Sequence, residues 1–380
     1  MAVLFWSSLF IILYAYFGYP LCLYIISFTK PNRKIETITS RYPNVSLLIS
    51  AYNEENVIED KILNSLSLNY PKDLLEIVVV SDASEDRTDE IVRCYIQKGV
   101  LLRSYEGRIG KTACLNKAVP LSKGDIIVFS DANSKYDRDA IKHLVKRFND
   151  PKVGLVTGST KYNSKNPNSI SKSVSAYSKI EEITKKLESK IGSCVGADGA
   201  IFAIRKQLYQ QLKEYDINDF VIPLYIIRQG DRAVLEEDAF CVEELAKGIK
   251  GEFKRQARIT NRTLRAIFSN IDMLNPFNFG IFSFELLSHK LLKFLIPYFM
   301  LMLLITNVFL LTNSSLYSIF LACQLLFYLF GLTGFRDESA RQRARLISVP
   351  QTFLATNMAI LWGWVTYFKG ETYTTWSSLR

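Results

Sequence analysis

Four stretches of the chain pair a short apolar run with an amphipathic run, and this pattern predicts strands followed by helices. The first apolar run, VSLLIS at residues 45–50, ends in a polar turn and leads into NVIEDKILNSLSLN. The same order recurs from LEIVVVSD, from VLLRSY and from DIIVFSD. Strands that alternate with helices of this length predict a mostly parallel sheet with right-handed crossovers. The expected fold class is therefore α/β.

Beyond residue 163 the pattern changes from strands to amphipathic helices. Apolar residues recur near the helical period and predict one long helix that covers the sheet or the acceptor side: Ile170, Val174, Tyr177, Ile180, Ile183, Leu187 and Ile191. A second set favours a helix lying on a membrane surface: Leu264, Ile267, Phe268, Ile271 and Leu274. A packed core helix is the alternative for this second set.

Apolar segments of membrane-spanning length lie on both sides of the α/β core. Residues 1–29 carry no charge and exceed the ~20 apolar residues that a spanning helix needs. Because a signal peptide is shorter and starts with basic residues, we expect an uncleaved anchor. Three further candidates follow the core, at residues 294–311, 316–335 and 346–368. The last of them is alternatively re-entrant or interfacial.

Basic residues gather beside these segments, whereas the turn at residues 313–315 has none. By the positive-inside rule the core faces the cytoplasm of an integral membrane protein in the cell membrane. The expected organisation is a transmembrane helix over 1–29 and a catalytic domain over 40–262. Interfacial helices over 263–290, a membrane region of about three segments over 291–368 and a tail over 369–380 follow.

The net charge of +10 changes the list of expected partners. Much of the excess flanks the apolar segments and no nucleic-acid motif accompanies it, so we expect membrane lipids and a diphosphate as partners and no nucleic acid. The six cysteines show no metal-ligand spacing. The two histidines, His143 and His289, fall in helical or juxtamembrane patterns, so neither histidine catalysis nor zinc binding is expected.

Two carboxylates, Asp82 and Asp131, each stand at the end of an apolar strand. The carboxyl ends of strands are where open α/β sheets bind ligands, and two such acids can share a cation that holds a diphosphate. This arrangement predicts a nucleotide-sugar enzyme. A helix N-cap is the alternative role for Asp82. An ATPase is excluded because Tyr105 stands where the phosphate-binding loop that ends in Gly110-Lys111-Thr112 would need glycine.

The order of loops over roughly residues 45–265 resembles the family 2 glycosyltransferases, which have a GT-A fold. SAYNEE and VVVSDASEDRT correspond to the family's first two loops, the second with Ala83 in place of the usual glycine. The resemblance implies that the nucleotide of a UDP-sugar contacts Ala51, Tyr52, Glu54 and Asp82, and that Lys111 contacts its diphosphate. A solvated lysine at a helix start is the alternative for Lys111.

FSDANS matches the metal-binding motif of the same family, with Asn133 in place of its second acid. The resemblance implies Asp131 and Asn133 as ligands of Mg²⁺ or Mn²⁺, which prefer oxygen.

INDFVIPLYIIRQGDR resembles the family's base motif and implies Asp219 as the general base, with Asn218 in place of the usual preceding acid. A helix N-cap is the alternative for either residue. GSCVGADGA resembles the sugar loop, and the resemblance implies contacts with the donor or acceptor sugar for Asp198, Gly199 and Asn218. Arg258 would stabilise the departing diphosphate, although Ile259 replaces the tryptophan that follows in processive synthases.

The resemblance as a whole implies an inverting membrane glycosyltransferase. Such an enzyme moves a sugar from a UDP-sugar to a lipid-linked acceptor or a growing polysaccharide for cell-surface glycan synthesis. The alternative is a degenerate family member that acts as a membrane-tethered binding or scaffold subunit. The departures at Asn133, Asn218 and Ile259 favour that alternative, whereas four retained acids speak against it: Asp82, Asp131, Asp198 and Asp219.

Overall fold

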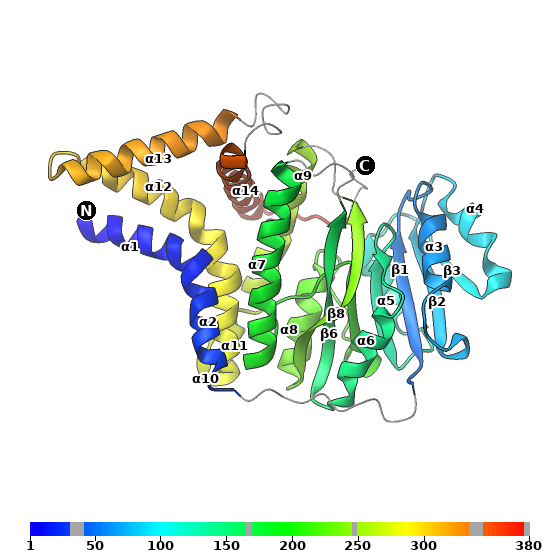
Figure 1. The fold of residues 1–380 in the computed structure, drawn as a ribbon. Coiled ribbons are helices and arrows are strands. Elements are labelled where there is room, and N and C mark those ends of the chain that lie inside the picture. Colours follow the sequence, from blue (N-terminus) through cyan, green and yellow to red (C-terminus); the bar gives the residue numbers. More distant parts are fainter. Residues whose placement is uncertain (31–41, 164–168, 245–248, 334–344, 376–380) are drawn as a thin grey trace. The chain divides into compact units, whose positions relative to one another are not determined.

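A computed structural model describes residues 1–30, 42–163, 169–244, 249–333 and 345–375 (Figure 1). The chain forms two compact units, each assembled from separate stretches. We call Lys30–Asn163, Lys185–Leu245 and Thr372–Arg380 the sheet unit, and Met1–Thr29, Ser164–Thr184 and Ala246–Glu371 the helical unit. Each unit is described by itself.

The sheet unit is built on eight strands in the order β3-β2-β1-β4-β7-β6-β8-β5. Their bounds are β1 Val45–Ala51, β2 Leu75–Asp82, β3 Val100–Tyr105, β4 Ile126–Asp131, β5 Lys135–Tyr136, β6 Val153–Asn163, β7 Ile201–Arg205 and β8 Arg232–Glu244. The pairs β3-β2, β2-β1, β1-β4 and β6-β8 are parallel. β7 runs antiparallel to β4 and β6, and β5 antiparallel to β8. The expected α/β class with a mostly parallel sheet is confirmed.

Helices cover both faces of this sheet. Their bounds are α3 Ile58–Leu66, α4 Thr88–Arg93, α5 Lys111–Ala118, α6 Ala140–Lys146 and α8 Asn218–Arg228. Alternate residues of β1, such as Leu47 and Ile49, form one core with Ile62 of α3, Val92 of α4 and Ile141 of α6. α5 packs on the opposite face, where Cys114 contacts Asp82. The sheet therefore fixes the loops at the carboxyl ends of β1, β2 and β4.

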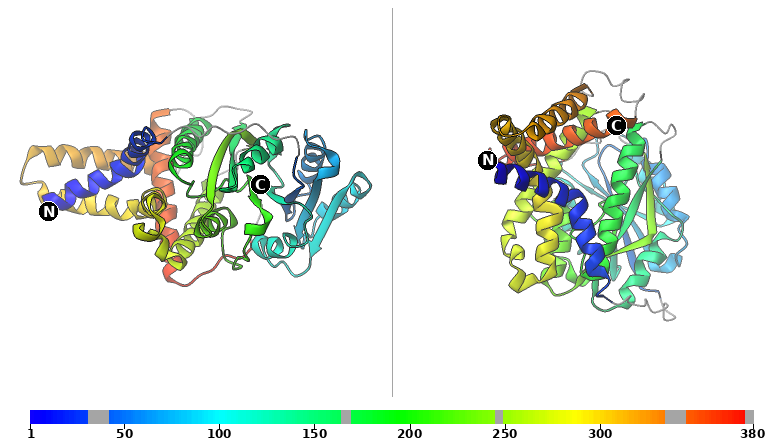
Figure 2. Two further views of the ribbon diagram at one scale, coloured as in Figure 1. Left: turned by 90° about the horizontal axis from the view of Figure 1, so that it is seen from below. Right: turned by 60° about the vertical axis from the view of Figure 1, so that its left-hand side comes forward.

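The helical unit consists of helices. Their bounds are α1 Ala2–Leu13, α2 Tyr19–Ser27, α9 Ile249–Ser269, α10 Pro276–Phe279, α11 Ile281–Leu286, α12 Leu292–Leu310, α13 Ser315–Thr333 and α14 Arg345–Phe368. α1 lies beside α12, and α13 beside α14 (Figure 2). π-helical turns at Tyr14–Gly18 and Leu287–Leu291 join α1 to α2 and α11 to α12. α7, Ser169–Ile191, begins in this unit and ends in the sheet unit.

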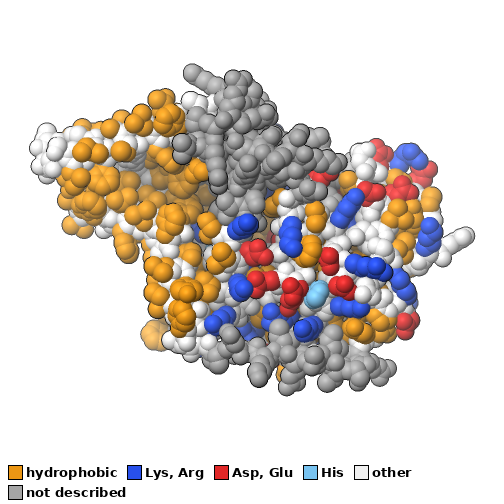
Figure 3. All heavy atoms as spheres, in the orientation of Figure 1, with side chains coloured by type: hydrophobic (Ala, Val, Ile, Leu, Met, Phe, Trp, Pro, Cys, Tyr) orange, Lys and Arg blue, Asp and Glu red, His pale blue; other side chains and the backbone are white. Residues whose placement is uncertain are grey.

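Three helical stretches in the described part of the chain are long and apolar enough to cross a membrane, namely Ala2–Ser27, Ile281–Leu310 and Ser315–Thr333. Their outer surfaces are rich in exposed apolar side chains, which Figure 3 shows over α1, α12 and α13. The fourth expected segment, α14, is not among them. Its Gln351, Asn357 and Thr366 are buried, and such a polar face suits packing against other helices better than contact with lipid.

Two expectations about the apolar sets hold only in part. α7 exists, but its Ile180 and Ile183 are 45% and 54% exposed. Glu181 of the same helix is turned towards His289 and Lys293, so polar pairing decides which face of α7 is covered. The second apolar set does not form one helix, because α9 ends at Ser269 before a 3₁₀ turn at Ile271–Leu274.

The apolar face of α9 points into the helical unit. Leu264 and Ile267 are fully buried, and α9 packs against α14. The packed-helix alternative therefore holds for these two residues. Exposed apolar side chains do occur just beyond α9, at Ile271 and at Phe277, which is 94% exposed. Whether residues 263–290 lie at a membrane interface stays a prediction.

Candidate active site

The loops after β1 and β2 are tied to each other by hydrogen bonds. The backbone N–H of Glu54 donates to Thr88 Oγ1 at 2.8 Å, and the N–H of Glu85 donates to Asn53 Oδ1 at 2.8 Å. Ala51 is fully buried, and Tyr52 and Glu54 are more than nine-tenths buried. Parallel pairing of β1 with β2 places these residues beside Asp82. The expected nucleotide-binding residues are therefore gathered at one edge of the sheet.

Ala83 stands in the left-handed backbone region, with φ of 54°. A side chain with a Cβ adopts this conformation at a cost, whereas glycine does so freely. The backbone geometry thus explains why glycine suits this position in the resembling family.

Asp82 does not cap a helix. Its two carboxylate oxygens accept hydrogen bonds from the N–H of Gly110, each at 3.0 Å, and Asp86 accepts from the N–H of Thr88 at the start of α4. The side chain of Asp82 is fully buried. Asp82 therefore fixes the loop that precedes Lys111, and direct contact with a nucleotide stays a prediction.

Arg108 lies at the same edge of the sheet, although the sequence did not suggest it as a site residue. Its guanidinium is 3.7 Å from the centroid of the Tyr52 ring, which is stacking distance. Arg108 also has positive φ, 45°, between Gly107 and Gly110, which are left-handed as well. Three of the four residues from Gly107 to Gly110 thus have positive φ, which distinguishes the backbone of the loop EGRIGK.

Lys111 and Asp131 form the most direct contact between expected site residues. The Lys111 ammonium lies 2.5 Å from Asp131 Oδ1, and the two side chains are 18% and 39% exposed. Lys111 is the first residue of α5 and Asp131 the last of β4. The solvated-lysine alternative for Lys111 does not hold. The Lys111 ammonium thus pairs with the same Asp131 carboxylate that is expected to bind a divalent metal ion.

The residues around Asp131 fit a hard divalent cation. Asp131 offers a partly exposed carboxylate and Asn133, two residues on, offers an amide oxygen. Oxygen is the ligand atom that Mg²⁺ and Mn²⁺ prefer, and a site with one carboxylate leaves positions for diphosphate oxygens. Asp131 and Asn133 would hold the ion.

The expected general base, Asp219, lies beside the expected sugar loop at Gly199. Asp219 lies in the first turn of α8, and a Cβ built on Gly199 would be 2.8 Å from Asp219 Oδ2. Only glycine leaves that carboxylate oxygen uncrowded. Neither Asn218 nor Asp219 is the N-cap of α8, which is Ile217. Asn218 is 6% exposed and its Nδ2 finds no hydrogen-bond partner among the described residues.

The Asp198 carboxylate is occupied by hydrogen bonds from residues of the sheet unit. It accepts hydrogen bonds from Thr160 N and Oγ1, both at 2.9 Å, and from Ala200 N at 3.1 Å. These bonds favour a role in shaping the loop before β7 over direct contact with a sugar. Arg258 lies on α9 in the helical unit, and its role at the diphosphate stays a prediction.

The last described residues of the chain reach the donor loop within the sheet unit. A Cβ built on Gly110 would lie 2.3 Å from the carbonyl oxygen of Thr374. Gly110 has φ of 92°, so any other residue there would be both strained and crowded. The segment at Thr374 therefore belongs to the surroundings of Asp82 and Lys111.

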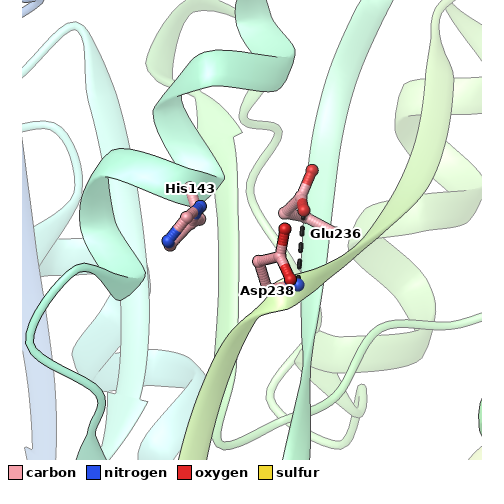
Figure 4. Close-up of side chains that lie close together, drawn as sticks. All are labelled: His143, Glu236 and Asp238. Carbon is pink, nitrogen blue, oxygen red and sulfur yellow. Dashed lines mark hydrogen bonds between the residues drawn. The ribbon is translucent and has the colours of Figure 1, made fainter.

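His143 lies near two carboxylates, those of Glu236 and Asp238 (Figure 4). Their potential ligand atoms lie within 4.8 Å of one another. The guanidinium of Arg147 already pairs with Glu236, and the N–H of Asp238 donates to the same carboxylate at 3.3 Å. Because the charge of Glu236 is compensated in this way, the group is better explained as an ion-pair network than as a metal centre.

Residues 46–213 match the model of the family described as Glycosyl transferase family 2. This stretch is a family 2 glycosyltransferase domain. The match covers β1 to β7 and, with them, every expected nucleotide and metal residue. Among relatives, a beta-monoglucosyldiacylglycerol synthase from Nostoc sp. is 35% identical over 135 residues, 34% of this chain and 29% of that protein.

A poly-beta-1,6-N-acetyl-D-glucosamine synthase from Staphylococcus aureus is 25% identical over 236 residues, 60% of this chain and 56% of that protein. The family 2 domain and its surroundings thus span less than two thirds of either relative. A mannosyltransferase from Pyrobaculum calidifontis, solved with GDP-Man and Mn²⁺, superposes with a TM-score of 0.75 at 21% identity. That likeness covers 96% of this chain and 99% of the other and confirms the expected GT-A fold.

Proposed function

We propose that the protein is an inverting glycosyltransferase that moves a sugar from a nucleoside diphosphate to an acceptor at a membrane. The donor is a UDP-sugar, and the acceptor is a lipid-linked sugar or a growing polysaccharide. The observation that carries the proposal is the Lys111–Asp131 pair at the end of β4, next to the interlocked loops of β1 and β2. The names of both relatives, a glycolipid and a polysaccharide synthase, support this acceptor class.

In the proposed reaction Asp219 takes the proton of the acceptor hydroxyl as that oxygen attacks the anomeric carbon. Gly199 leaves room beside the Asp219 carboxylate, and Asn218 Nδ2 is available to donate to a sugar hydroxyl. A divalent cation, when bound, neutralises charge on the departing diphosphate. Lys111 moves from Asp131 to the diphosphate as the donor binds. The anomeric configuration inverts because attack and departure occur on opposite faces.

We propose that the sheet unit lies in the cytoplasm and that the three apolar helices lie in the cell membrane, because of the distribution of basic residues. The structure also weakens part of the argument against the alternative function, a membrane-tethered scaffold subunit. Asp82 and Asp198 have structural partners, so only Asp131 and Asp219 argue for retained chemistry. Activity must therefore be tested directly.

The test is the release of nucleoside diphosphate from a panel of UDP- and GDP-sugars by the full chain in lipid, with Mn²⁺ or Mg²⁺. We expect metal-dependent turnover with one donor and a loss of about 10²- to 10⁴-fold in Asp219→Asn, the usual contribution of a general base. Asp73→Asn, an exposed position away from the site, is the matched control and should keep full activity.

Turnover with no donor, or an unaffected Asp219→Asn variant, would contradict the proposal and favour the scaffold alternative. Partition of labelled product between a lipid extract and a polymer fraction identifies the acceptor class.

A further inference from the structure

Lys61 is a fully buried lysine that the proposed reaction does not use. It lies in α3, its side chain is 1% exposed, and Ile58 and Ile62 of the same helix are fully buried beside it. Its ammonium donates a hydrogen bond to the carbonyl oxygen of Ser134 at 2.6 Å. It also lies 3.9 Å from the centroid of the Tyr136 ring. Both contacts are with the segment that follows Asp131 and Asn133.

Asn64, one helical turn after Lys61, holds the same segment. Its Nδ2 donates to the carbonyl oxygen of Tyr136 at 2.9 Å, and its Oδ1 accepts from the Tyr136 N–H at 2.8 Å. Lys61 and Asn64 therefore fix three backbone groups of Ser134–Tyr136 from one face of α3. We call these two side chains the α3 clamp.

The clamped segment is connected rigidly to the expected metal ligands. Ser134 Oγ donates to the carbonyl oxygen of Asp131 at 2.8 Å. The Tyr136 hydroxyl donates to the carbonyl oxygens of Phe129 at 2.9 Å and Ala200 at 3.1 Å. A shift of Ser134 would thus be transmitted to the turn that carries Asp131 and Asn133.

Burying the Lys61 ammonium between α3 and the turn at Ser134 costs free energy. Burial lowers the pKa of Lys61 to about 7, which reflects the cost of keeping its charge away from water. An apolar side chain of the same length would fill the space without that cost. The hydrogen bond to Ser134 is what an apolar side chain cannot supply.

We propose that Lys61 is a positioning residue which, with Asn64, sets the turn of Asp131 and Asn133 for a divalent cation bound with a nucleoside diphosphate. The inference rests on the proposed function. Lys61 acts through Ser134 and touches neither substrate nor ion. Its charge alone would have the opposite effect, because a cation near Asp131 repels a second one. We expect the correct geometry of the turn to raise the affinity for the cation more than the charge of Lys61 lowers it.

The test compares Lys61→Met with Lys135→Met in the full chain. Methionine matches the lysine side chain as far as Cε and removes its charge and its N–H donors. Lys135 joins the same two elements through Asp60 at 2.6 Å, but both side chains are more than half exposed. Mn²⁺ affinity is measured by electron paramagnetic resonance, with Mn²⁺ alone and with UDP or GDP added, alongside the thermal midpoint.

We expect Lys61→Met to weaken the nucleotide-dependent Mn²⁺ affinity by about 10- to 100-fold, as the loss of an outer partner of a metal ligand does. Its thermal midpoint should stay equal or rise. Lys135→Met should remain within about twofold of wild type, as exposed pairs contribute little. Lys61→Arg, which keeps a donor, should fall between wild type and Lys61→Met.

An Mn²⁺ affinity for Lys61→Met that equals or exceeds that of wild type would overturn the proposal. If Lys61→Met does not fold, Asn64→Ala provides the same test, and an unchanged affinity in that variant would overturn it as well. Wild-type protein that binds no Mn²⁺ with either nucleotide would instead refute the proposed function, and this role of Lys61 with it.

Discussion

Three non-glycine residues have left-handed backbone in the part of the chain that the structure describes: Asn53, Ala83 and Arg108. They follow β1, β2 and β3, so all three lie in loops at the carboxyl edge of the sheet. Backbone strain of this kind persists only where the surroundings hold it and is concentrated at functional sites. Its grouping around Tyr52 and Asp82 supports the location of the donor site independently of the sequence motifs.

Ala83→Gly should stabilise the protein. Removing the Cβ relieves a left-handed alanine, which costs roughly 1–2 kcal/mol, while the added flexibility of glycine costs roughly 0.5–1 kcal/mol. We therefore expect a net gain of about 0 to 1.5 kcal/mol in the free energy of unfolding, measured by denaturant titration. Ala113→Gly in α5 is the control and should destabilise. Equal losses in both variants would show that Ala83 is not strained.

Among elements, α7 and the helices around residue 289 are joined by one carboxylate within the helical unit. Glu181 contacts His289 Nε2 at 2.7 Å, Lys293 Nζ at 3.1 Å and Lys290 Nζ at 3.8 Å. Burial would raise the pKa of the Glu181 carboxyl, but the neighbouring His289 and lysines hold it well below its usual range. This cluster fixes the first part of α7.

Glu181→Gln should lower the free energy of unfolding by roughly 2 kcal/mol at neutral pH, because it leaves partly buried cations without their counter-charge. A carboxyl with a lowered pKa stabilises above its unfolded-state pKa of about 4.3 and loses that effect as the pH falls through its folded-state pKa. The difference between wild type and variant should therefore shrink below about pH 4. Thermal unfolding in detergent measures both effects.

Glu182→Gln, the adjacent change, is the control for Glu181→Gln and should have little effect. A difference from wild type that persists unchanged in acid would contradict the ionic explanation.

The alternation of apolar and polar residues was enough to predict β1, which runs Val45–Ala51 against an expected 45–50, and to predict a helix along α7. It was not enough to orient α7, because the cations that bind Glu181 lie more than a hundred positions later. The antiparallel insertion of β7 between β4 and β6 was also missed, since IFAIR is short and follows a glycine-rich loop. The helical spacing of Ile58, Lys61 and Ile62 is enough to predict that Lys61 points inward. It does not predict Ser134 as the hydrogen-bond partner of Lys61.

For the whole molecule, the proposed cytoplasmic position of the sheet unit is a prediction from the distribution of basic residues, and it can be checked with the protein's own cysteines. Cys94 is exposed on the sheet unit and Cys323 is exposed on α13. With Cys323 replaced by serine, an impermeant maleimide should label Cys94 in inverted vesicles and not in intact cells. Cys94→Ser is the blank. Labelling in intact cells would reverse the assigned topology.

The contact between Gly110 and Thr374 has a consequence for biosynthesis. Thr374 is synthesised long after Gly110 and after the apolar helices α12 and α13, so the donor loop acquires its full surroundings only once those helices have been made. The apolar helices are by then already synthesised and available to the membrane. We therefore expect the apolar helices of a nascent chain to enter the membrane before the donor loop is complete.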